Sequence, residues 1–137
     1  MSITVEQVQG DVPVTILSTH GDLDASNYQE LIASARELYS SGTRDLLLDM
    51  SSTPFMSSAG IVAIHAVALL MRNEQPPDPE SGWEAFHAID RDLESGRQQH
   101  VKLLNPQPRV ERALEKTGLK GIFDIFTDRE TAIASFR

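Results

Sequence analysis

The sequence contains no cysteine among its 137 residues. This absence excludes disulfides, thiol nucleophiles and cysteine-based metal sites. The chain also lacks an apolar run of the roughly 20 residues that a membrane helix needs, because its longest apolar segment, residues 60–71, is shorter and is typical of a buried helix. The N-terminus, Met1–Glu6, lacks the basic start and apolar core of a signal peptide. We therefore expect a cytoplasmic protein with no membrane segment.

Basic residues are fewer than acidic ones, with 12 Lys and Arg against 20 Asp and Glu, which gives a net charge of −8. A nucleic-acid-binding domain needs a basic surface, so we expect no nucleic-acid partner. The acidic surface has two interpretations: it keeps the protein soluble, or it steers a basic partner toward it. Hydrophobic residues form 40% of the chain, which predicts a single globular domain over residues 1–137.

The chain is organised around residues 46–71. The apolar run Leu46–Leu48 is typical of a buried strand, a polar turn carrying Pro54 follows, and Ser57 and Ser58 precede a long apolar segment. This order predicts a strand, a loop and a helix that begins near Ser57 or Ser58. The first turn of a helix exposes unpaired N–H groups and the positive end of the helix dipole. A hydroxyl there can cap the helix, and a phosphate attached there is stabilised.

Hydrophobic patterns elsewhere predict an α/β fold with a mixed, mostly parallel sheet of four to five strands flanked by about four helices. The expected strands cover residues 3–8, 12–19, 43–50, 100–104 and 122–126, the first two forming a hairpin. Outside the central stretch, the expected helices cover residues 25–40, 105–117 and 129–136. Helices that connect the later strands imply parallel pairing there.

Residues 74–98 differ from the rest in composition. A proline-rich polar stretch leads to a short helix expected over residues 82–95, with Ser81 as its cap. One face of this helix is apolar and carries Trp83, Phe86, Ile89 and Leu93. Two interpretations remain open: the apolar face covers part of the core, or it is an arm that binds a partner or forms a homodimer.

The central stretch resembles the signature of the STAS domain, the fold of bacterial anti-sigma factor antagonists. The resemblance lies in Asp49-Met50-Ser51 and in Phe55-Met56-Ser57-Ser58-Ala59-Gly60-Ile61. The usual signature is an acid, a hydrophobic residue and Ser, then a gap and Asp-Ser-Ser/Thr-Gly-Leu, in which a partner kinase phosphorylates the first serine after the aspartate. Ser58 aligns with that serine and Gly60 with the glycine, whereas Ser57 replaces the aspartate and Ala59 replaces the second hydroxyl residue.

Other segments extend the resemblance over nearly the whole chain. Gly21-Asp22-Leu23-Asp24 is similar to the family segment that leads into the first helix, and Asp24 takes the position of a family aspartate close to the phosphorylation site. The alternative is that Asp24 or Ser26 merely caps this helix. Residues 101–136 also resemble the family, with an Asn-Pro turn and a helix ending in Thr-Gly-Leu. Compared with the family, residues 74–98 are expected to be a helical insertion between the central helix and the strand at residues 100–104.

The resemblance implies a regulatory protein-binding module. Its expected partner is an anti-sigma factor or a serine kinase-like protein, and its affinity is expected to be switched by phosphorylation of Ser58, with Ser57 as the alternative acceptor. The expected partner-binding residues are Asp24, Met56, Ser57, Ser58, Ala59, Gly60 and Ile61. Two alternatives stay open. Ser57 or Ser58 is only an N-cap and phosphorylation has been lost, or the protein is a scaffold or ligand-sensing module that acts through homodimerisation or the inserted arm.

An enzyme is not expected, and neither are catalytic residues, a metal or a cofactor. The sequence has no Gly-x-Ser-x-Gly elbow and no glycine-rich phosphate loop. No acid–base partner can be assigned from sequence to His20, His65, His87 or His100. His65 lies among apolar residues of the predicted helix and is expected to be a satisfied or half-exposed residue rather than a ligand. The enzymatic alternative is a serine hydrolase built from Ser58, a histidine and Asp24.

Overall fold

A five-stranded sheet forms the centre of the molecule. The computed structural model describes residues 1–78, 82–93 and 96–137, and only the backbone of residues 82 and 83. The strands follow the spatial order β1-β2-β3-β4-β5, with bounds Ser2–Gln9, Pro13–His20, Leu46–Ser52, Val101–Leu104 and Ile125–Phe126. β1 and β2 pair as an antiparallel hairpin, and every later neighbour is parallel. The mixed, mostly parallel sheet predicted from the sequence is confirmed.

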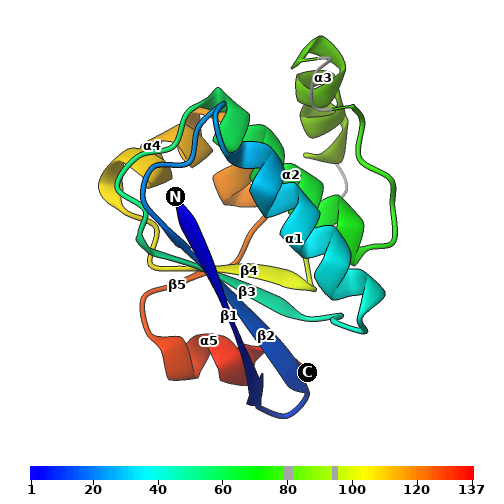
Figure 1. The fold of residues 1–137 in the computed structure, drawn as a ribbon, viewed down its shortest axis with the longest axis vertical. Coiled ribbons are helices and arrows are strands. Elements are labelled where there is room, and N and C mark those ends of the chain that lie inside the picture. The colour runs from blue at the N-terminus through cyan, green and yellow to red at the C-terminus, as the bar shows by residue number, and fades with distance from the viewer. Residues whose placement is uncertain (79–81, 94–95) are drawn as a thin grey trace.

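Helices cover both faces of this sheet (Figure 1). They are α1 (Tyr28–Ser40), α2 (Ser58–Met71), α3 (Gly82–Asp92), α4 (Pro108–Thr117) and α5 (Arg129–Ser135). α1, α2 and α4 lie on one face, α5 lies on the other, and α3 stands beyond α1 and α2, away from the sheet (Figure 1). Within the described residues, no helix is both long and apolar enough to span a membrane.

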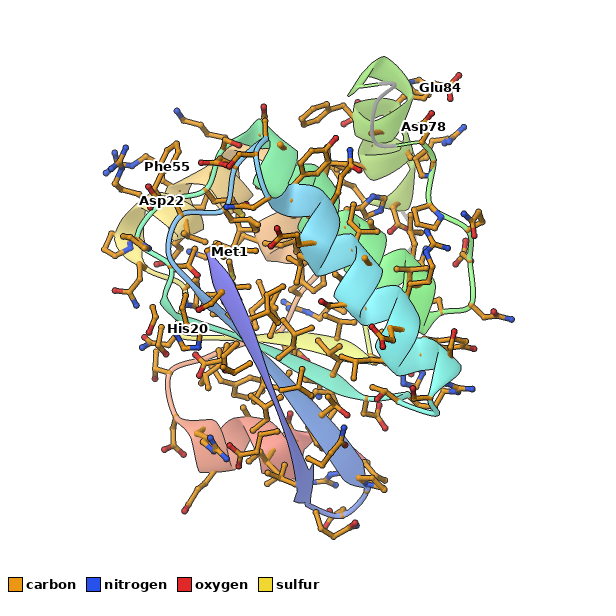
Figure 2. All side chains as sticks on the ribbon, viewed as in Figure 1. Met1, His20, Asp22, Phe55, Asp78 and Glu84 are labelled. Carbon is orange, nitrogen blue, oxygen red and sulfur yellow. The ribbon has the colours of Figure 1, made fainter. Side chains whose placement is uncertain are left out.

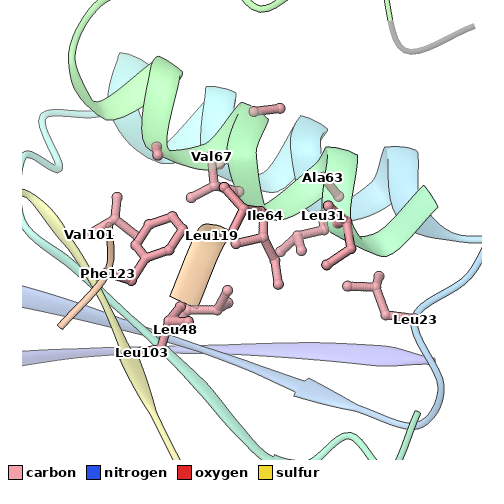
Figure 3. Packing of buried hydrophobic residues seen from close by; sticks show 14 of the residues in the cluster. Leu23, Leu31, Leu48, Ala63, Ile64, Val67, Val101, Leu103, Leu119 and Phe123 are labelled. Carbon is pink, nitrogen blue, oxygen red and sulfur yellow. The ribbon is translucent and has the colours of Figure 1, made fainter. Parts of the chain in front are cut away.

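Alternating strand residues build a hydrophobic core on each face of the sheet. Leu46 and Leu48 of β3 belong to the larger core beneath α1 and α2, whereas Leu47 belongs to the smaller core beneath α5. Figure 3 shows Leu48 below Ile64 and Val67 of α2. The uninterrupted apolar run in β3 was expected to be a buried strand, and the structure shows that helices cover both of its faces.

Several element boundaries differ from the prediction. β3 covers Leu46–Ser52 rather than residues 43–50, and α4 begins at Pro108 rather than at residue 105. The first helix begins at Tyr28 rather than at residue 25, because residues 25–27 form a turn. The last strand was expected over residues 122–126, and this is wrong for its first part: only Ile125–Phe126 pairs with β4. The chain leaves α4 through Gly118 at φ +83° and then makes a 3₁₀ turn over Leu119–Gly121. The two residues after this turn are buried in the larger core rather than paired in the sheet.

α3, the helix in the connection between α2 and β4, packs on the core. In α3, Ala85 and Ile89 are 2% and 1% exposed, and Phe86 packs against the larger core, as does Leu93 directly after the helix. These contacts favour the core-covering interpretation of the apolar face. Ser81, the expected cap, and the side chain of Trp83 lie outside the described residues.

Charged groups fasten α3 to α2. His65, which is 3% exposed, places Nε2 2.8 Å from Oδ2 of Asp92, and Nη1 of Arg72 lies 3.0 Å from the other carboxylate oxygen. Burial lowers the pKa of His65 and outweighs the opposing effect of Asp92. The neutral imidazole thus donates Nε2–H to the carboxylate. His65 is a satisfied core residue, as expected, but its acidic partner lies 27 residues away and was not evident from the sequence.

Gly60 allows α2 to start in close contact with the preceding loop. A Cβ atom at this position would lie 2.2 Å from Cγ of Met56 and 3.1 Å from the carbonyl oxygen of Leu23. Met56 and Leu23 are 2% and 0% exposed, so neither has room to retreat. The glycine is required here by space.

We predict that Gly60→Ala destabilises the protein by about 1–3 kcal/mol, because overpacking outweighs the helix propensity that alanine gains. Gly121→Ala is the matched control, since no atom lies within 4 Å of the Cβ position there. Urea unfolding monitored by circular dichroism measures both variants. Equal stability of the two variants would show that the loop yields to the extra methyl group.

We also predict that Asp92→Ala lowers the free energy of unfolding by about 2–3 kcal/mol, because it leaves the buried Nε2–H of His65 without its acceptor and removes one of the acceptors of Arg72. Asp90→Ala, an exposed position on the same helix, is the control. Urea unfolding gives the free energies, and amide hydrogen exchange reports whether α3 opens locally. If both variants lose the same stability, the charged groups do not hold α3 in place.

Candidate functional site

Two loops meet side by side at the carboxyl ends of β2 and β3. Gly21 N–H donates to the carbonyl of Ser52 at 2.9 Å, and Leu23 N–H donates to that of Phe55 at 3.0 Å. The carbonyl of Leu23 then accepts from Ser57 N–H at 2.9 Å. These hydrogen bonds continue the parallel pairing beyond the strands and fix the entry to α2. Figure 2 shows Asp22 and Phe55, one from each loop, near each other on this side of the molecule.

The structure brings the seven expected partner-binding residues together around the N-terminus of α2. Ser58 is exposed, and Asp24, Ser57 and Ala59 are half-buried. The other three are buried: Met56, Gly60 and Ile61. Those three shape the loop from beneath, and the four others form the accessible surface.

Ser57 and Ser58 have different environments. Ser57 occupies the N-cap position with ψ 179°, but its side chain makes no capping hydrogen bond. Its hydroxyl oxygen is buried and has no hydrogen-bond partner among the described residues. Ser58 is the first residue of α2 and is exposed to solvent. Of the two candidate acceptors, Ser58 is the one open to another protein.

Asp24 is held in a local turn. Its Oδ1 accepts hydrogen bonds from the hydroxyl of Ser26 at 2.6 Å and from the N–H of Ser26 at 2.9 Å. These bonds lower the pKa of Asp24, so the carboxylate is ionised at neutral pH. The N-cap of α1 is Asn27, so the interpretation of Asp24 or Ser26 as the helix cap is wrong. Asp24 directly follows Leu23, whose carbonyl bonds Ser57, so its charge lies beside the start of α2.

Some residues near this site were not identified from the sequence. The guanidinium of Arg109, in the first turn of α4, lies 4.5 Å from the ring centre of Phe55. The amide of Asn105 donates to the hydroxyl of Ser51 at 3.2 Å. The parallel order of β3 and β4 could have indicated this meeting, because the carboxyl ends of parallel strands share one edge of the sheet.

The hydrolase alternative finds no support in these contacts. The carboxylate of Asp24 accepts from Ser26, whereas His65 pairs with Asp92 and His100 pairs with Asp45 at 2.9 Å. In the part of the chain that the structure describes, no three side chains of His, Asp or Glu are grouped so as to hold a metal ion. The exposed surface at α2 is suited to recognition by another molecule.

Comparison with known proteins finds relatives that span nearly the whole chain. BtrV of Bordetella bronchiseptica, described as a candidate anti-sigma factor antagonist, is 23% identical over all of this chain and 96% of its own length. A candidate anti-sigma factor antagonist of Thermotoga maritima has a crystal structure with a TM-score of 0.69 and 18% identity, covering 95% of this chain and 90% of that one. The Bacillus cell fate determinant SpoIIAA, in its phosphorylated form, has a TM-score of 0.57 and 17% identity, covering 96% of both chains.

The solved structures establish that the fold is shared. A family model described as the STAS domain matches residues 2–75, which contain the strands β1 to β3, both serines and the whole of α2. This match covers more than half of the chain and includes the loops that form the candidate site. The protein therefore belongs to the STAS domain family.

Proposed function

We propose that this protein is an anti-sigma factor antagonist whose affinity for its partner is switched by phosphorylation of Ser58. The partner is an anti-sigma factor that acts as a serine kinase, and the complex forms in the cytoplasm. One observation carries the proposal: an exposed serine is the first residue of a 14-residue helix, on a surface that two hydrogen-bonded loops hold in place. In this role Ser58 is a substrate of the partner and not a catalyst.

A phosphate on Ser58 would be tolerated by this protein. The first turn of α2 carries unpaired N–H groups and the positive end of the helix dipole, both of which stabilise an anion. The first turn contains no acidic residue. Modification would therefore leave the fold intact while changing the surface that a partner meets.

The same phosphate would weaken a complex that depends on close contact. Ser58 and Ala59 have small side chains, and Gly60 beneath them has none, so a partner surface can approach the helix end closely. Phosphorylation adds nearly two negative charges and three oxygen atoms there. A partner surface that is apolar or acidic would lose contact and would pay a desolvation penalty.

Ser57 is proposed to tune this switch. The family signature carries an aspartate at this position, and this chain has a hydroxyl group instead. Asp24 remains ionised next to the site. With one acid rather than two beside Ser58, a phosphoserine experiences less repulsion, so the modified state is easier to form than with the usual signature.

The relatives support the proposal by their descriptions. BtrV and the Thermotoga protein are both described as candidate anti-sigma factor antagonists, and SpoIIAA is a member of this fold seen in a phosphorylated form. The family model ends at residue 75, where the connection to α3 begins. This end supports the further proposal that residues 74–98 are an insertion into a single STAS domain over residues 1–137.

We predict that Ser58→Asp weakens binding to the partner by about tenfold or more, equivalent to at least about 1.4 kcal/mol, whereas Ser58→Ala binds as the unmodified protein does. The partner is first isolated by binding to the unmodified protein in a lysate of the cells that produce this protein. Calorimetry then measures the dissociation constant of the partner for each variant. Ser40→Asp is the control for added charge, because it places an acid at an exposed position at the far end of α1.

Intact-mass measurement with peptide mapping on protein purified from its own cells completes this test. A fraction heavier by one phosphate on Ser58 is expected. Phosphate on Ser57 would assign the switch to the neighbouring residue. Equal affinity of Ser58→Ala and Ser58→Asp for the captured partner would contradict the switch.

A further inference from the structure

A second candidate site lies on the outer side of α1 and α2, away from the sheet. A cavity of about 360 Å³, open to solvent on one side, lies between α1, α2, residues 75–78 and the start of α3. Small-molecule sites in proteins typically have volumes of about 300–1,000 Å³. On α2 the cavity is lined by residues from Val62 to Leu69, so it lies beyond the first turn that carries Ser58. Figure 1 shows α3 standing over the same side of the two helices.

The walls of the cavity are mainly aliphatic. Ile32 of α1, Val62 and Leu69 of α2 and Ala85 of α3 face it, and each is less than 9% exposed. Pro76, which is also buried, contributes from the connecting segment. The space is open to solvent on one side, since Ala33 and Arg36 on its rim are exposed. An aliphatic group that enters it would cover these apolar walls and leave water itself, which favours binding.

Charged groups fix the position of α3 beside the cavity. His65 lines the cavity and also bonds Asp92, which Arg72 bonds from the other side. A buried ionic network contributes little net stability compared with apolar packing, but it fixes the position of the helices that it joins. The network therefore fixes the position of α3 relative to α2 beside the cavity, while Ala85 and Ile89 pack on the core.

One cation at the cavity lacks an acidic partner. Nη1 of Arg36 lies 3.3 Å from the amide oxygen of Gln75, a long hydrogen bond to a neutral group. Within residues 1–78, 82–93 and 96–137, no carboxylate forms an ion pair with Arg36. Asp78 also lines the cavity but already has an interaction of its own. A carboxylate ligand would offer Arg36 two parallel charge-assisted hydrogen bonds, which the amide cannot provide.

We propose that this cavity binds a medium-chain aliphatic carboxylic acid. The hydrocarbon chain lies between the aliphatic walls of α1 and α2, and the carboxylate pairs with Arg36 at the mouth. Gln75 is positioned to donate a further hydrogen bond from its amide nitrogen. This site is separate from Ser58, and its occupancy does not depend on phosphorylation.

The test is a titration of the full chain with octanoate, followed by ¹H–¹⁵N NMR and calorimetry. Octan-1-ol and octylamine are the probes that keep the chain and change the head group. We expect octanoate to bind with one site per chain and to shift the amide signals of residues 29–36, 62–69 and 75–78. Octan-1-ol should bind about tenfold or more weakly, and octylamine should bind less than either, because Arg36 repels it.

Two variants locate the site. Arg36→Gln should weaken octanoate about tenfold and leave octan-1-ol unchanged, whereas Arg112→Gln, an exposed arginine on α4, should change neither. Ala33→Leu adds volume from an exposed position that lines the cavity, so it should block octanoate without disturbing the core. Ala134→Leu, exposed on α5 at the other face of the sheet, is its control.

Three results would overturn the proposal. Octanoate and octan-1-ol binding equally would exclude recognition of the carboxylate. Signal changes centred on α5 or β1 instead of the cavity would place the ligand elsewhere. The third result is that octanoate does not bind up to its solubility limit, and that the folded Ala33→Leu variant gives the same titration as the unmodified protein. This would show that the cavity does not bind an aliphatic carboxylic acid.

Discussion

The pairing of Leu23 with the loop after β3 is the contact on which the candidate site depends. Its N–H donates to Phe55 and its carbonyl accepts from Ser57, so one residue binds the backbone on both sides of Met56. Its side chain is fully buried against Gly60. Only a glycine leaves enough space there, because a Cβ atom at position 60 would crowd the Leu23 side chain. Because this pairing sets where the backbone turns into α2, it also decides that Ser57 is the N-cap and that Ser58 is the first exposed residue of the helix.

In this arrangement, the residues that shape the site are buried, and a different set of residues forms its exposed surface. The buried residues Met56, Gly60 and Ile61 determine the shape of the helix end, and their side chains do not reach solvent. Asp24 supplies a negative charge, because hydrogen bonds from Ser26 lower the pKa of its carboxylate and keep it ionised. The surface at Ser58 is therefore small, uncharged and next to one carboxylate, a setting in which a single added phosphate changes both shape and charge.

Patterns within single elements made much of the fold predictable from sequence. The run Leu46–Leu48 indicated a buried strand, and Gly118 marked the end of α4. The motif around Ser58 indicated the family and the start of α2, both of which are confirmed. These features are local, because a strand or helix shows its period and its end signals within its own residues.

What the sequence did not reveal depends on contacts between distant residues. The bond between His65 and Asp92 joins residues 27 positions apart, and the stacking of Arg109 on Phe55 joins different elements. The last strand was predicted too long because residues 122–124 have strand-like composition, yet the 3₁₀ turn before them directs Ile122 and Phe123 into the core. Burial competes with pairing there, and composition alone does not decide between them.

The two helices that form the cavity walls also begin at the candidate site. α1 starts just after Asp24 and α2 starts at Ser58, and the hydrogen bonds of Leu23 join the loops that lead into them. A ligand that altered the spacing of α1 and α2 would act on both halves of the partner surface at once. Such coupling requires the ligand and the partner to prefer different spacings, since a ligand with equal affinity for both arrangements shifts neither. The short backbone bonds between the two loops oppose a change at that end. Any movement would be larger near α3, where side-chain contacts rather than backbone pairing hold the elements together.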